Sequence, residues 1–188
     1  PLRSSFLARG VPVLNEQVHI GFVGCFVNRF TNKHNSKKGH QPKGGGINDF
    51  AFRNQAVACS LYRKQCWEQV NGYDEDMKFG YEDWEFPLAI TKRGWKCNII
   101  PEYLFYYRDK PNSMLKNTLL YHREDNIKYL FIKHNEIYKY RFKDTISHLI
   151  ELSKRYKKQA YKRENDIKYK LGNYIIYPFR IIKRFFNR

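Results

Sequence analysis

The first part of the chain alternates short apolar runs with polar, glycine-containing stretches. Runs rich in β-branched and aromatic residues predict extended segments at residues 19–30 (HIGFVGCFVNRF), 56–62 (AVACSLY), 95–101 (WKCNIIP) and 102–108 (EYLFYYR). Helical spacing of apolar residues predicts helices at residues 11–18 and 63–70 and from Tyr81–Asp83 to Gly94. The polar stretch at residues 31–46 predicts a loop, either a solvated connection or a flap over an anionic ligand. Together these elements predict an α/β fold with a mixed sheet and flanking helices.

Beyond Met114 the pattern changes to long charged stretches that bear leucine and tyrosine, which predict two or three helices from Thr118 to about Lys170. At the end of the chain, in the segment 171–188, residues from Pro178 onward separate on a helical wheel into an apolar, aromatic side and a Lys/Arg side. Such a helix either packs on the domain or lies on an anionic membrane surface. The sequence therefore predicts a helical basic tail.

Composition and charge narrow the class of protein. The chain has 188 residues, 42% of them hydrophobic and 17% aromatic, which excludes a disordered protein and indicates one core with appendages. The net charge is +17, with an excess of +4 over residues 1–109 and +13 over residues 110–188. Four cysteines without CxxC spacing indicate neither a zinc site nor a disulfide framework, and no apolar run predicts a membrane span. We therefore expect a cytoplasmic protein, peripheral on the inner face of the plasma membrane if the tail binds lipid.

Acidic residues gather in one place despite this positive charge. The stretch GYEDWEF puts Asp83 in the first turn of a predicted helix, with Glu82 and Glu85 beside it. Capping of the helix is one explanation, because a carboxylate there is stabilised by the helix dipole. General base catalysis on a carbohydrate hydroxyl is the alternative, since Tyr81 and Trp84 offer aromatic faces on which a sugar ring could rest.

Several ordered motifs carry a resemblance to a known family. The succession ACSLYRKQCWEQVNGYDEDMKFGYEDWEF, then GW, then IIPEYLFYYRDKPNSM resembles the second half of a family-two, inverting, GT-A-fold glycosyltransferase over about residues 18–115. The resemblance implies that residues 1–115 are the acceptor-side half of this nucleotide-diphospho-sugar transferase fold and that residues 116–188 are a helical extension. It implies that Asp83 is the catalytic base, with Glu82 as its partner in the ED pair.

The resemblance also implies how the donor is held. The segment YYRDKPNSM matches the part of the family that grips the sugar-nucleotide diphosphate, through Arg108, Lys110 and Ser113. A surface salt bridge is the less favoured alternative for Arg108. In the family, Mn²⁺ or Mg²⁺ is held by a DxD motif in a preceding nucleotide-binding half, which we expect to lie outside this chain. Asp74-Glu75-Asp76 spells DxD, but it follows a turn rather than a strand, so no metal ligand is predicted in this chain.

The expected function is an enzyme that transfers a sugar from a nucleotide-diphospho-sugar to a hydroxyl of a glycan or lipid-linked acceptor, as in cell-surface polysaccharide or lipopolysaccharide synthesis. We expect the chain alone to be a partial enzyme with little turnover. Pro87 departs from a regular helix, so the helix either begins near Asp83 or is kinked. Two alternatives stay open: a non-catalytic glycan- or membrane-binding module, and a nucleic-acid-binding protein, which the absence of any nucleic-acid-binding motif disfavours.

Overall fold

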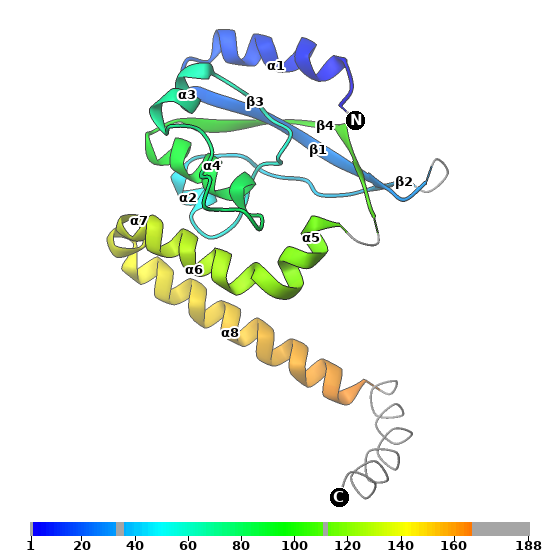
Figure 1. The fold of residues 1–188 in the computed structure, drawn as a ribbon, viewed down its shortest axis with the longest axis vertical. Helices are drawn as coiled ribbons and strands as arrows, with labels where there is room; N and C mark the ends of the chain where they lie inside the picture. The colour runs from blue at the N-terminus through cyan, green and yellow to red at the C-terminus, as the bar shows by residue number, and fades with distance from the viewer. Residues whose placement is uncertain (1, 33–35, 111–112, 167–188) are drawn as a thin grey trace, which may run out of the picture. The chain divides into compact units, whose positions relative to one another are not determined.

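A computed structural model describes residues 2–32, 36–110 and 113–166. Its sheet has four strands: β1 (Ile20–Phe30), β2 (Ser36–Lys38), β3 (Leu61–Tyr62) and β4 (Lys96–Arg108). β1 is central, since β4 pairs with it in parallel while β2 and β3 pair with it antiparallel at its two ends (Figure 1). The predicted α/β class with a mixed sheet and flanking helices is confirmed.

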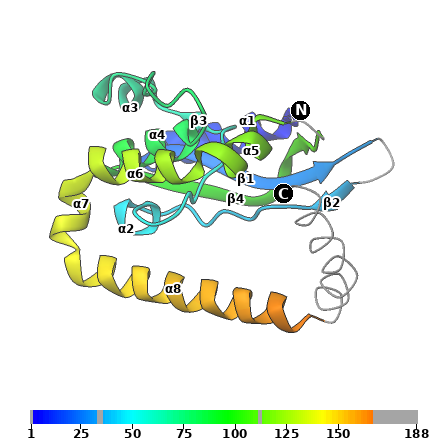
Figure 2. The ribbon, with the colours of Figure 1, turned by 60° about the horizontal axis from the view of Figure 1, so that its bottom comes forward.

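Helices cover both faces of the sheet (Figures 1 and 2). Helix α1 (Ser5–Glu16) lies on one face, where Phe6 packs with Val23 and Leu104. The opposite face is covered by α2 (Ile47–Phe50), α4 (Glu82–Lys92) and α6 (Arg123–Lys133). The sheet therefore separates two hydrophobic clusters, and the larger one lies under α4.

The strand predicted at residues 19–30 is confirmed as β1, whose apolar run from Ile20 to Val27 fits burial on both faces. The two extended segments predicted at residues 95–108 form one strand, β4. Pro101 is accommodated because the register jumps from Cys25 opposite Ile100 to Phe26 opposite Tyr103, so the proline lies in a bulge where no ladder donor is needed.

Two predictions about the strands were wrong in part. Only Leu61–Tyr62 of the strand predicted at residues 56–62 pairs with β1, because the preceding residues turn, with the Ser60 hydroxyl donating to the Val57 carbonyl. The loop predicted at residues 31–46 contains the short strand β2, which pairs with Asn28–Phe30 at the end of β1. The first helix begins earlier than predicted, at Ser5.

The predicted helices of residues 63–70 and 81–94 are confirmed as α3 (Lys64–Gln69) and α4. The later helices are α5 (Met114–Asn117), the π-helical turn η1 (Thr118–His122), α6, α7 (Asn135–Tyr140) and α8 (Phe142–Asn165).

The chain divides into two compact units, Pro1–Tyr138 and a second that begins at Lys139. The first unit thus includes α6, whose Leu130 is fully buried in its core. The boundary after residue 115, between an acceptor-side half and a helical extension, stays a prediction. None of the helices in the described part of the chain is long and apolar enough to span a bilayer. The predicted basic tail, residues 171–188, lies outside the described residues.

Candidate active site

The backbone that leads into α4 is held in place by polar side chains from η1 and α6. The Thr118 hydroxyl donates to the Phe79 carbonyl at 2.7 Å, and the Asn126 amide donates to the carbonyls of Phe79 and Gly80, both at 3.1 Å. Gly80 (φ 98°) and Tyr81 (φ 71°) both have left-handed backbone conformations, which make the sharp turn into the helix. The first turn of α4, which carries Asp83, therefore starts from an anchored backbone.

Pro87 lies inside α4. The helix begins at Glu82, which agrees with the expectation from the sequence that it starts near Asp83. Pro87 has no N–H for the carbonyl of Asp83, four residues earlier. The side-chain amide of Asn54 supplies the missing donor, at 3.0 Å from the Asp83 carbonyl oxygen. Asn54 thus compensates for the proline and fixes the backbone that carries the Asp83 carboxylate.

Asp83 lines a shallow hollow with room for about one water molecule. Aromatic rings form much of its wall: Phe86 stacks on Tyr73 with 4.2 Å between ring centroids and meets Tyr62 edge-on at 5.4 Å. The remaining wall comes from Phe22, Val57, Ala58, Ser60 and Pro87. The half-buried carboxylate loses hydration, and this burial, together with the negative charge of Glu82, raises the pKa of Asp83 to about 6.

The other predicted residues of the ED segment have different surroundings. Glu82 is half-buried beside Asp83 and acts on it through its charge. Tyr81 is half-buried and tilted against Trp84, with 5.8 Å between ring centroids. Trp84 is only 7% exposed, and its indole N–H donates to the carbonyl of Phe50 at 2.8 Å. The indole is therefore a core side chain, as is the ring of Phe86 at 4% exposure, and the exposed aromatic rings near Asp83 are those of Tyr62 and Tyr73.

Arg108, Lys110 and Ser113 lie at and beyond the end of β4, and none of them lines the Asp83 hollow. Arg108 and Lys110 are exposed, whereas Ser113 is half-buried. Among the described residues, no acidic side chain lies within ion-pair distance of Arg108. The three residues are therefore near one another in the sequence but do not form part of the hollow beside Asp83.

A second hollow, of about 260 Å³, opens near this strand end. Its lining includes Lys37 and an ion pair in which the Arg29 Nε donates to both oxygens of Asp109, at 3.0 and 3.1 Å. The Arg29 guanidinium also lies over the ring of Tyr107, 5.7 Å from its centroid. The end of the sheet is therefore a polar surface rich in cationic side chains.

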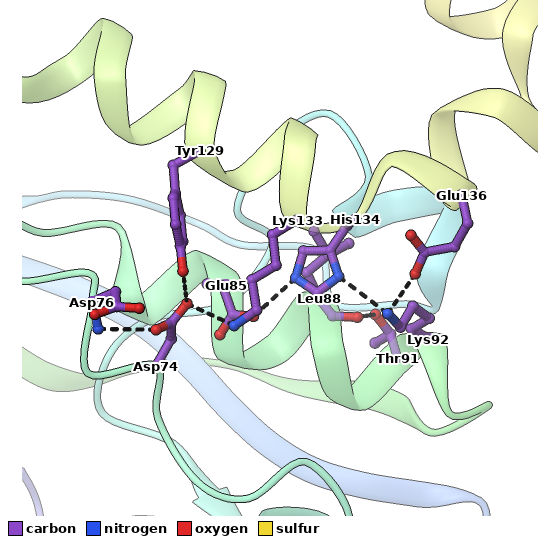
Figure 3. A network of polar contacts seen from close by, with 10 residues as sticks. All are labelled: Asp74, Asp76, Glu85, Leu88, Thr91, Lys92, Tyr129, Lys133, His134 and Glu136. Atoms are coloured by element: carbon purple, nitrogen blue, oxygen red, sulfur yellow. Dashed lines mark hydrogen bonds and ion pairs between the residues drawn. The ribbon is translucent and has the colours of Figure 1, made fainter.

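Figure 3 shows a buried polar network that ties α6 to α4. Glu85, 2% exposed, lies 2.8 Å from both Lys133 Nζ and His134 Nε2. Burial alone would raise the pKa of Glu85, but hydrogen bonds from His134 and Lys133 hold that pKa below its ordinary value. Because an ionised carboxylate only accepts, Nε2 carries the proton and Nδ1 faces Lys92 Nζ at 3.4 Å. This network fixes the helix that presents Asp83.

The literal DxD takes part in the same network. The Asp74 carboxylate accepts hydrogen bonds from Lys133 Nζ at 2.6 Å, from the Tyr129 hydroxyl at 3.0 Å and from the Asp76 backbone N–H at 2.9 Å. Nowhere in the described part of the chain do three His, Cys, Asp or Glu side chains gather as metal ligands. These residues therefore do not fit the Mn²⁺ or Mg²⁺ that the family resemblance implies.

Sequence reasoning missed Ser60, Tyr62 and Tyr73, which form part of the Asp83 hollow. Tyr62 and Tyr73 stand in the motifs CSLYRK and NGYDE, so their place in the resemblance was a signal that could have found them. Asn54 has no such signal, since its role depends on Pro87 in space. No protein-family model matches the chain, and a search of curated proteins also finds no match.

Proposed function

We propose that this chain forms the acceptor side of an inverting glycosyltransferase, in which Asp83 is the general base. The reaction would move a sugar from a nucleotide-diphospho-sugar to a hydroxyl of a glycan or lipid-linked acceptor. The single observation that carries the proposal is the half-buried Asp83 at the start of α4, which lines a hollow beside the exposed rings of Tyr62 and Tyr73. Such aromatic walls suit the apolar faces of sugar rings.

The proposed step is a direct displacement. Asp83 takes the proton of the acceptor hydroxyl as its oxygen forms a bond to the anomeric carbon, and the bond from that carbon to the nucleoside diphosphate breaks. A base is most effective when its pKa is near the working pH, and a pKa of about 6 leaves Asp83 ionised at neutral pH while making it a stronger base than an ordinary carboxylate. Positioned base catalysis contributes on the order of a hundred- to ten-thousand-fold.

In this proposal the exposed Arg108 and Lys110, with Ser113, contact the diphosphate of the donor. Their positive charge at the end of β4 suits that anion. Nucleotide recognition and the metal ion are assigned to a preceding half of the fold, because the described residues of this chain hold no ligand set for them. Donor binding by this chain alone is therefore expected to be weak.

The proposal is tested by incubating the natural polypeptide that carries this chain with a panel of nucleotide sugars and mixed glycan and lipid-linked acceptors. Release of nucleoside diphosphate is the readout. We expect release from one donor, with strong dependence on an acceptor. Absence of release from every donor, combined with glycan binding by the same polypeptide, would contradict the proposal.

That contradicting result would favour a second candidate, a glycan-binding module without catalysis. The aromatic walls of the Asp83 hollow support this alternative as well, since stacking on sugars needs no base. The two functions differ at one residue. Asp83→Asn keeps the shape of the side chain, so it leaves glycan binding by a module unchanged but removes the base of a transferase.

A further inference from the structure

Helix α8 (Phe142–Asn165) exposes a row of large apolar side chains. Phe142 is 67% exposed, Ile146 40%, and Leu149 and Ile150 each 51%. Spacings of three and four residues put these four side chains on one side of the helix, within about 80° of Phe142 at about 100° per residue. An apolar row of this kind on a helix of 24 residues needs a partner surface.

The charges of α8 are sorted around this apolar row. The helix contains seven Lys and Arg residues and three acidic residues. Asp144 and Glu151 lie opposite Phe142, at about 180–200° around the helix, and only the third acid, in the last turn, lies on the apolar side. Lys143 and Lys157 border the row at about 60–100°, and four further cations lie on the polar side with Asp144 and Glu151, at about 120–220°: Lys154, Arg155, Lys158 and Lys162. The apolar row is therefore bordered by lysines and lies opposite a polar side on which cations outnumber acids.

We propose that α8 binds along the surface of an anionic phospholipid membrane. The apolar row would enter the boundary between head groups and acyl chains, and the flanking Lys side chains would reach the phosphates. This pattern of an apolar face bordered by cations is the one that interfacial helices use. The inference goes beyond sugar transfer and stands without it, because membrane binding requires neither donor nor acceptor.

Charge complementarity selects the membrane over two other occupants. A second copy of α8 packed on the row would bring its own Lys143 and Lys157 against those of the first, and two of the three acids of the helix, Asp144 and Glu151, lie on the far side. Those acids are also already paired, Asp144 with Arg141 and Glu151 with Arg155. Residues 167–188 would be no better as a cover, since they contain six Lys and Arg residues and no acid. Only an anionic surface matches the row and its border together.

The test compares two single variants of the full chain in sedimentation with phospholipid vesicles. Leu149→Glu puts a negative charge in the middle of the apolar row, whereas Ser147→Glu adds the same charge on the exposed polar side, at about 140° from Phe142. With vesicles containing about one third phosphatidylglycerol, we expect Leu149→Glu to lower the partition coefficient by about tenfold or more and Ser147→Glu by no more than about threefold. Far-UV circular dichroism confirms that both variants keep their helices.

Three results would overturn the inference. Equal binding by the two variants would show that the apolar row does not enter the membrane. Binding of the wild-type chain to pure phosphatidylcholine as strong as to the anionic vesicles would remove the role of the flanking cations. A dimer in sedimentation velocity that Leu149→Glu dissociates, with vesicle binding unchanged, would assign the row to a second copy. Residues 167–188 are the same in both variants, so any lipid binding of their own cancels in the comparison.

Discussion

Replacing Asp83 by asparagine should stabilise the folded chain at neutral pH. In the folded chain the carboxyl group keeps its proton up to about pH 6, against an ordinary pKa of 3.8, because burial and Glu82 disfavour the charged form. In the unfolded chain the same group ionises near its ordinary pKa. Wild-type stability therefore falls as the pH rises from about 4 to about 6 and stays lowered above that range.

The size of this effect follows from the difference between the two pKa values. About two pH units, at about 1.4 kcal/mol each, set a ceiling of about 3 kcal/mol at neutral pH. Since Asp83 is only half-buried, solvent screening reduces the expected gain to about 1–2 kcal/mol. Asparagine has the shape of the protonated acid and cannot ionise, so the Asp83→Asn variant should match the wild type at about pH 4 and exceed it at about pH 8.

Urea unfolding followed by circular dichroism at several pH values between these limits measures the difference. Glu82→Gln is the matched control: it also removes one carboxylate from the first turn of α4, but it should gain less, because Glu82 is the second cause of the raised pKa and burial is the first. A free energy of unfolding for Asp83→Asn that equals the wild-type value at pH 8, or a gap that does not change with pH, would refute the reasoning.

Three further outcomes are expected. Gly80→Ala should lower the free energy of unfolding by about 2–3 kcal/mol, because a Cβ would lie 2.8 Å from the Thr118 hydroxyl. Gly94→Ala is the control, since Gly94 has a similar φ of 95° but open space around it, and should cost only about 1 kcal/mol. Equal costs would contradict the anchoring role of η1. Glu85→Gln should lower the free energy of unfolding, measured in urea, by about 2–3 kcal/mol at pH 7. The loss should be smaller below about pH 4, since the lowered pKa of Glu85 gives stability that acid removes. Glu136→Gln, at an exposed site, should change the free energy of unfolding by under about 1 kcal/mol. Calorimetric titration of the chain with UDP and UDP-sugars, with and without Mn²⁺, should show binding that is absent or about millimolar, and metal-dependent micromolar binding would instead mean that this chain completes a donor site.

Local patterns were sufficient to predict the elements whose structure depends on their own residues. The continuous apolar run of β1 and the ED segment of α4 with Gly94 after it are such patterns. Strand β2 was missed because its polar sequence becomes a strand only by pairing with the end of β1. Likewise, no local signal shows that the segment predicted as a strand at residues 56–62 begins to pair only at Leu61.

The candidate site could be predicted for Asp83 but not for its surroundings. Trp84 looked like a sugar platform because it is an aromatic residue in an acidic cluster, yet the helix turns its indole toward Phe50. Tyr73 and Asn54 come from other segments, and only the folded chain brings them to α4. The network of Glu85 with His134 likewise joins residues 49 positions apart, a separation that no local spacing rule covers.

The most direct measurement is sugar transfer by the natural polypeptide carrying Asp83→Asn, compared with Glu82→Gln, at saturating donor and acceptor. If Asp83 is the base, Asp83→Asn lowers kcat by about a hundred- to ten-thousand-fold while donor affinity, measured on the same samples, stays unchanged. Glu82→Gln should retain most of the activity and shift the acid limb of the pH profile downward, since its charge helps raise the pKa of Asp83. Transfer by Asp83→Asn within about threefold of the wild type would contradict the assignment of Asp83 as the general base.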